Sequence, residues 1–136
     1  MADNPMSVFQ VAGRAMSAQL LRMNTTASNL ANVGGIAGSA DAAYKTMKPV
    51  FRTSFDAANG LATVDVEKIV TAGETPTKRY DPANPLADKD GNIYEAAVDE
   101  TRELVDMMET ARSYQNNVEV MNTAKQLTLD TLKLGR

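Results

Sequence analysis

The chain contains no cysteine, no histidine and no tryptophan, and aromatic residues make up only 5% of its 136 residues. Without cysteine and histidine it can form no disulfide, no thiol nucleophile, no Cys/His zinc site and no catalytic pair that uses imidazole. With so few aromatic side chains, a base-stacking platform for nucleic acid is not expected. Any catalysis would have to rest on carboxylate, Ser/Thr, Lys or Tyr side chains.

A basic excess and long apolar runs are also absent. The 17 acidic residues outnumber the 14 basic ones, for a formal net charge of −3, so no broad attraction for nucleic acid is expected. No stretch approaches the roughly 18 consecutive apolar residues of a membrane span. The first ten residues lack the basic start of a cleavable signal peptide, and Gln10 and Arg14 interrupt the apolar run. Composition alone therefore indicates a cytoplasmic protein.

Glycine and proline are concentrated in the middle of the chain, and neither occurs in residues 14–33 or 92–134. This distribution predicts two long helices around an irregular insertion. The expected fold class is mainly α, with long N- and C-terminal helices forming an antiparallel coiled-coil pair and a small β-containing insertion between them. The expected parts are the N-terminal helix in 1–33, the insertion in 34–97 and the C-terminal helix in 98–136.

The first expected helix carries a heptad seam, with apolar residues at alternating steps of three and four. Ser7 and Gln10 fit a capping box at its start, and Gly34-Gly35 should end it. The seam includes two polar members, Gln19 and Thr26. The residues predicted to pack against a helix or a subunit are Phe9, Met16, Met23 and Leu30.

The second expected helix begins near Asp99, ends at Gly135 and carries two seams. Two adjacent seams indicate a helix that touches more than one neighbour. We therefore expect one seam to pack on the first helix and the other to face other subunits. The first seam consists of Met107, Ala111, Tyr114, Val118 and Met121, and the second of Val120, Ala124, Leu127, Thr131 and Leu134.

The insertion carries hairpin and turn signals. Strand-like runs at 49–55 and 63–70 flank Asn59-Gly60, which predicts a type I′ turn with positive φ at both residues. Residues 88–92 resemble the start of a calcium loop. However, the glycine falls at loop position 4 instead of 6, and Asp99 occupies position 12, so a plain Asp-Gly turn is favoured.

No catalytic or phosphate-binding motif accompanies these elements. The neighbouring carboxylates Glu103 and Asp106 are expected on a solvated helix face, without the apolar cleft that acid–base chemistry requires. The residues therefore predict a helical interaction protein with no catalytic, cofactor or metal site. A generic coiled-coil adaptor and a small calcium-binding or enzymatic domain remain as alternatives.

Three segments, in this order, resemble the bacterial flagellar rod and hook protein family and together cover nearly the whole chain. The first is residues 8–33, whose helix ends in Ser28, Asn29, Leu30, Ala31 and Asn32. The second is residues 80–94, which begin with Tyr80, Asp81 and Pro82 and are typical of proximal-rod members. The third is residues 109–135, with Arg112, Ser113, Tyr114 and Gln115 at the core of the signature. One departure follows Asn32. The family commonly has a threonine shortly after this asparagine, whereas this chain continues with Val33-Gly34-Gly35-Ile36.

The resemblance implies a structural subunit of the proximal rod of the flagellar basal body, and not an enzyme. It implies a location in the periplasm, export by the flagellar type III apparatus without a cleaved signal peptide, and a requirement for flagellum assembly and motility. The implied roles are transmitting torque and lining the export channel. The implied partners are other copies, other proximal-rod proteins, the adaptor between rod and membrane ring, and the distal-rod protein, with no cofactor and no nucleic acid.

Overall fold

The computed structural model describes residues 5–135, which form two helices and five strands. The strands make two antiparallel sheets, a β2–β3 hairpin and a three-stranded sheet of order β1-β5-β4. In chain order the elements are α1 (Pro5–Ala31), β1 (Ile36–Ala37), β2 (Met47–Asp56), β3 (Leu61–Thr71), β4 (Thr77–Tyr80), β5 (Asn92–Glu95) and α2 (Glu100–Leu134).

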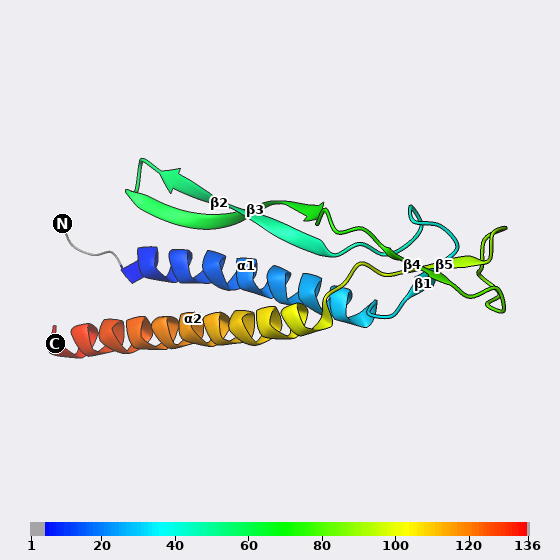
Figure 1. Ribbon diagram of the computed structural model, residues 1–136. Coiled ribbons are helices and arrows are strands. Elements are labelled where there is room, and N and C mark those ends of the chain that lie inside the picture. The colour runs from blue at the N-terminus through cyan, green and yellow to red at the C-terminus, as the bar shows by residue number, and fades with distance from the viewer. Residues whose placement is uncertain (1–4, 136) are drawn as a thin grey trace.

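The helix pair and the hairpin form three layers. The hairpin lies along one side of α1, α2 runs antiparallel along the other, and the small sheet projects beyond the end of α1 (Figure 1). The prediction of a mainly α coiled-coil fold is therefore wrong, because the insertion contributes two antiparallel sheets and the fold is mixed α/β. The heptad pattern misled because α1 is covered by two different partners, so its apolar residues do not form a seam toward one helix.

The residues of α1 that are most buried are small or polar. Ala12, Ala18, Thr25, Thr26 and Asn29 are each at most 6% exposed, whereas the large seam residues are only half-buried. Small side chains allow neighbours to approach a helix closely on two sides. Across the described residues, the fully buried apolar set is Ala12, Ala18, Ala43, Ile93 and Ala97.

The helix ends follow from local chemistry. Asp99 is the N-cap of α2, where its carboxylate accepts a 3.1 Å hydrogen bond from the backbone N–H of Arg102, and Gly135 is the C-cap. Gly34 has a φ of +72° and follows the end of α1. The predicted capping box at Ser7 is wrong, because α1 already begins at Pro5 and Ser7 lies within its first turn.

The hairpin is longer than the sequence predicted, and its turn differs. The strands pair from Met47 with Thr71 to Asp56 with Leu61, which leaves a four-residue turn. Gly60 has a φ of +65°, but Asn59 does not have a positive φ, since only glycines do in the described chain. The predicted type I′ turn is therefore wrong. The Asp56 carboxylate accepts the backbone N–H of Ala58, so only one left-handed residue is needed to close the turn.

The loop between β4 and β5 is closed by Asp88. Its carboxylate accepts hydrogen bonds from the backbone N–H groups of Asp90 (2.9 Å) and Asn92 (2.8 Å). These bonds, chiefly that from Asn92, hold the pKa of Asp88 below its ordinary value. Gly91 has a φ of +77°, and a Cβ there would lie 2.9 Å from the Tyr80 ring. The Asp88 carboxylate is therefore used by the turn that contains Asp90 and Gly91.

Candidate subunit-assembly site

The folded chain exposes more surface than a compact protein of its size. Its accessible surface is 9226 Å², whereas a compact monomer of its mass, 14.6 kDa, exposes about 6,900 Å². The excess, roughly 2,300 Å², is as large as many stable protein–protein interfaces bury. Exposed large apolar residues are most numerous on α2: Leu104, Val105, Met108, Val120, Leu127, Leu129, Leu132 and Leu134.

The first predicted seam of α2 lies on the side that contains the buried residues of this helix. Glu103 and Thr110 are 2% and 0% exposed. The helical repeat places all five seam residues on the same side of α2 as these two. All five seam residues are half-buried: Met107, Ala111, Tyr114, Val118 and Met121. The corresponding residues of α1 are half-buried as well: Phe9, Met16, Met23 and Leu30.

The second predicted seam is much more exposed. Val120, Leu127 and Leu134 are 48%, 62% and 87% exposed, and Ala124 is half-buried. Val120, Ala124 and Leu127 line an open hollow of about 390 Å³, which Val8 of α1 closes on one side. Apart from this contact with the start of α1, residues 5–135 leave the apolar surface uncovered.

The C-terminal end of α2 extends past α1. α2 has 35 residues and α1 has 27, so about 12 Å of α2 has no part of α1 beside it. Figure 1 shows this extension at the C-terminal end of α2. Leu129, Leu132 and Leu134 lie there and are exposed. Of these residues, Leu134 continues the second seam, whereas the helical repeat places Leu129 and Leu132 on the side of the first seam, beyond the end of α1.

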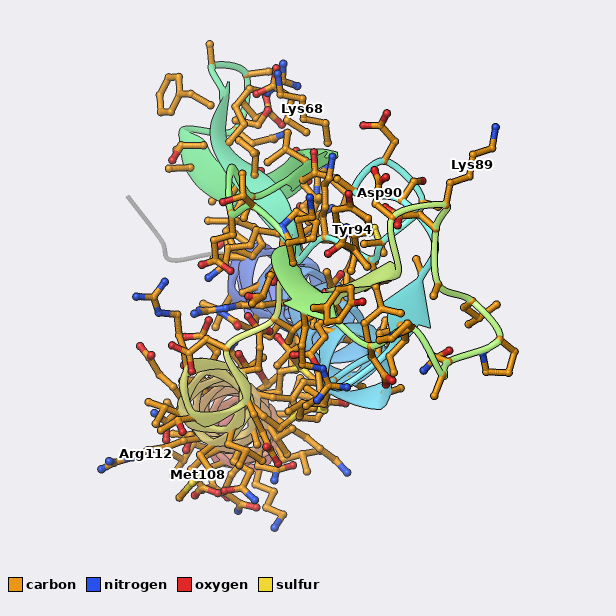
Figure 2. The ribbon with its side chains drawn as sticks, turned by 45° about the vertical axis from the view of Figure 1, so that its right-hand side comes forward. Lys68, Lys89, Asp90, Tyr94, Met108 and Arg112 are labelled. Atoms are coloured by element: carbon orange, nitrogen blue, oxygen red, sulfur yellow. The ribbon has the colours of Figure 1, made fainter. Side chains whose placement is uncertain are left out.

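A third face of α2 is exposed along its whole length. We call it the outer stripe, and Figure 2 shows two of its members, Met108 and Arg112, on the side of α2 far from the hairpin. From Arg112 onward its side chains are all polar, and half of them are uncharged. The outer stripe follows steps of three and four through Val105, Met108, Arg112, Gln115, Glu119, Thr123, Gln126 and Asp130.

Asn29 joins three segments of the chain through its side-chain amide, which is buried with the residue only 1% exposed. The Nδ2 group donates to the Met47 carbonyl at 2.8 Å and to Oε2 of Glu103 at 2.9 Å. The Oδ1 atom accepts from the Met47 N–H at 2.9 Å and from the Tyr44 hydroxyl at 2.8 Å. We call Asn29, Tyr44, Met47 and Glu103 the polar clamp, since it fixes α1, the start of the hairpin and α2 together.

Alternating charges extend the polar clamp toward solvent. Lys48 Nζ lies 4.0 Å from Glu103 Oε1 and 3.6 Å from Asp106 Oδ2, and Arg22 Nη2 lies 3.6 Å from Asp106 Oδ1. Burial raises the pKa of the Tyr44 hydroxyl, and the nearby Glu103 carboxylate raises it further. The expectation that Glu103 and Asp106 lie on a solvated face is therefore wrong for Glu103, which is buried. The signal was its position four residues before Met107, which continues the first seam by one turn.

The motif residues lie in three separate places. In the first segment only Asn29 is buried, while Leu30 and Asn32 are half-buried and Ser28 and Ala31 are exposed. In the second, Tyr80 packs over Gly91, with Pro82 beside it and Asp81 half-buried in the loop of the small sheet. In the third, Ser113 and Tyr114 are half-buried, while Arg112 and Gln115 belong to the outer stripe.

Residues 5–135 contain no group of three acidic side chains placed to hold a metal ion. No helix in this range is both long and apolar enough to cross a membrane.

Comparison with known families identifies the class. Residues 9–34 match the family model described as flagella basal body rod protein, and residues 89–134 match the one described as flagellar basal body rod FlgEFG protein C-terminal. The two matches cover most of α1 and all of α2. Both describe structural proteins of the flagellar basal-body rod.

Full-length relatives narrow the class further. The chain is 41% identical over 133 residues to the flagellar basal-body rod protein FlgC of Salmonella typhimurium and 42% identical over 133 residues to that of Escherichia coli O6:H1. It is 38% identical over 131 residues to that of Yersinia enterocolitica. Each alignment covers 96% of this chain and 98% of the relative. The chain therefore belongs to the FlgC family of flagellar basal-body rod proteins, which are structural components and not enzymes.

Proposed function

We propose that this rod subunit lines the export channel with the outer stripe of α2 and assembles through the second seam. The supporting observation is the division of α2 into three faces. One face packs on α1, a second is apolar and mostly uncovered, and the third is exposed throughout and polar from Arg112 onward. A helix in the wall of a water-filled tube needs this arrangement, with its own subunit behind it, neighbouring subunits beside it and water in front.

The composition of the outer stripe suits a channel wall. From Arg112 to Asp130 it presents one basic and two acidic side chains among neutral polar ones such as Gln115 and Gln126. Such a surface offers a passing unfolded chain neither an apolar patch to adhere to nor a strong field of one sign. Unfolded export substrates could then move along it without being retained.

Torque transmission requires that the layers of the subunit move as one body. The polar clamp supports this role, because the Asn29 side chain makes four hydrogen bonds of 2.8–2.9 Å, two to the backbone of Met47 at the start of β2, one to Glu103 of α2 and one to Tyr44. A load applied to the hairpin is then passed to α1 and α2 at one fixed point. Within this proposal the subunit sits in the proximal rod, in the periplasm.

The proposed partners follow from the same surfaces. Other copies and other proximal-rod proteins would cover the second seam and the C-terminal extension of α2. The adaptor between rod and membrane ring and the distal-rod protein would contact the ends of the array, and the type III export apparatus would deliver the chain. Flagellum assembly and motility would then depend on this subunit.

Assembly is tested with a matched pair of substitutions on α2. Leu127→Asp places a charge on the second seam, and we expect loss of basal bodies and motility, since a charge is rejected inside an apolar contact. Gln115→Asp places the same charge on the outer stripe and should leave basal bodies intact. Normal motility with Leu127→Asp would refute the assigned interface.

Channel lining is tested by cross-linking, which the absence of native cysteine makes simple. Gln115→Cys in assembled basal bodies should cross-link to a single-cysteine export substrate stalled in the channel. Lys68→Cys, on the hairpin at the opposite side of the subunit (Figure 2), should not. Cross-linking through position 68 but not 115 would reverse the proposed orientation.

A further inference from the structure

The turn of the hairpin contains the only asparagine of the chain that is followed by glycine, Asn59-Gly60. All four turn residues, 57–60, are exposed. The Asn59 side chain is not free, because its Nδ2 group donates to Oδ2 of Asp56 at 2.7 Å. Oδ1 of the same carboxylate accepts the backbone N–H groups of Ala58 at 3.0 Å and Asn59 at 3.4 Å.

We propose that Asn59 is a site of spontaneous deamidation and that the Asp56 carboxylate restrains the reaction. The backbone nitrogen of Gly60 attacks Cγ of Asn59 and loses its proton, a new N–Cγ bond forms, and the Cγ–Nδ2 bond breaks with release of ammonia. Water then opens the resulting succinimide at either carbonyl, which gives aspartate or isoaspartate at position 59. Neither step requires an oxidant or a second protein.

Two features of the turn favour attack at this position. Gly60 has no side chain to shield its nitrogen, and a Cβ built there would meet nothing within 4 Å. Every other asparagine is followed by a residue with a side chain or by proline. The exposed turn also admits the water that completes the reaction.

The bond to Asp56 opposes the attack. While Nδ2 is held by Oδ2 of Asp56, the Asn59 side chain cannot rotate freely to bring Cγ over the Gly60 nitrogen. This hydrogen bond is also the largest cause that holds the pKa of Asp56 below its ordinary value, so the acceptor remains ionised at neutral pH. An ionised acceptor makes a stronger bond to the amide than a protonated one would.

The product would change the turn. A carboxylate at position 59 has no N–H to donate to Asp56, and the two negative groups would repel each other across the same short separation. Isoaspartate would in addition lengthen the backbone of a four-residue turn by one methylene group. We therefore expect the tip of the hairpin to open while the paired strands nearer the polar clamp remain.

The experiment ages the full-length purified protein in mildly alkaline buffer and follows it by intact mass, peptide mapping and isoaspartate detection. We expect conversion at Asn59 and its loss in Asn59→Gln. Asp56→Ala should convert several-fold faster than the unmodified sequence. The matched control is Asp88→Ala, which removes the carboxylate of the other Asp-closed turn, where Asn92 precedes isoleucine, and should leave the rate at Asn59 unchanged.

A second variant separates restraint from loss of the turn. Asp56→Asn keeps an oxygen that accepts the turn N–H groups but removes the charge, so its rate should fall between those of the unmodified sequence and Asp56→Ala. Equal rates in all three would overturn the restraint by Asp56. Conversion in urea but none in the folded protein, or conversion spread over many asparagines, would overturn the site itself.

Discussion

The Asn29 side chain donates a 2.9 Å hydrogen bond to the carboxylate of Glu103, which lies 74 residues later in the sequence. This contact joins the last turn of α1 to the first turns of α2, which the whole insertion separates in the sequence. Both residues are at most 2% exposed, so neither can exchange its partner for water. This buried pair therefore helps to fix the position of one helix along the other, together with the ion pair between Arg22 and Asp106.

Replacing Asn29 by leucine should destabilise the folded chain strongly. The change keeps the branched shape of the side chain but leaves the Met47 backbone groups, the Tyr44 hydroxyl and the Glu103 carboxylate short of a partner. Buried polar groups without partners cost about 1–3 kcal/mol each, so we expect a loss of about 3 kcal/mol in the free energy of unfolding, measured by denaturant melts.

Asn32→Leu is the matched control for this change. Asn32 belongs to the same motif, but its side chain is half-buried and donates only to the Ser28 carbonyl at 2.7 Å. We expect a loss of about 1 kcal/mol or less. Equal losses at the two positions would mean that the polar clamp contributes nothing beyond ordinary helix-end hydrogen bonding.

The two seams of α2 should respond differently to a charge in the isolated subunit. Val118 is half-buried on the α1 side, so Val118→Asp should cost about 2 kcal/mol or more. Leu127 is 62% exposed, so Leu127→Asp should cost about 1 kcal/mol or less. Denaturant melts at low concentration measure both, and equal losses would show that the two seams form one core.

The two turn glycines offer a graded comparison. At Gly91 a Cβ would meet the Tyr80 ring at 2.9 Å, whereas at Gly60 it would meet nothing within 4 Å. Both have positive φ, so Gly60→Ala should cost about 1 kcal/mol from backbone strain alone. Gly91→Ala should cost more and should increase amide exchange in β4 and β5. A larger loss at Gly60 would contradict the packing of Tyr80 on Gly91.

The Tyr44 hydroxyl should make folding sensitive to alkaline pH. Its pKa is raised in the folded chain by burial and by Glu103, from an ordinary value of 10.0. The unfolded chain therefore ionises first, so this contribution is fully present below pH 10.0 and is lost as the pH rises through the higher folded value. Phenolate absorbance and denaturant melts over this range measure it.

The comparison for this titration is Glu103→Gln, which removes one of the two causes. We expect the Tyr44 pKa to move back toward its ordinary value, with burial still holding it above. Tyr44→Phe identifies which phenolate absorbance belongs to this residue among the four tyrosines of the chain. An unchanged titration in Glu103→Gln would leave burial as the sole cause.

Features that depend on nearby residues could be predicted from the sequence. Asp99 and Gly135 mark the ends of α2 because capping involves only the adjacent turn of backbone. The Asp90-Gly91 turn is formed by neighbours in the same way. The hairpin was predicted too short, because its first pair, Met47 with Thr71, lies where the backbone of Met47 is held by Asn29.

The polar clamp and the fold class depend on residues far apart in the chain. The residues next to Glu103 in the sequence are typical of a solvent-exposed helix start. Its burial depends on contacts with Asn29 of α1 and Lys48 of β2, which sequence neighbours do not reveal. The heptad spacing of α1 is real, but spacing alone does not tell whether a helix faces one partner or two. For the candidate site, periodicity predicted two seams on α2, while the exposure of their residues depends on where α1 lies and where it begins.

Four of the five fully buried apolar residues in the described chain are alanines, and the fifth is Ile93. Alanine removes little hydrocarbon from water, so unfolding the isolated subunit exposes little new apolar surface. The heat capacity change of unfolding scales with that surface and should therefore be small for a chain of this length. The stability of the free subunit should then vary little with temperature, with a broad, shallow maximum and a gradual calorimetric transition. A steeper transition should appear only after neighbouring subunits have covered the leucines of α2.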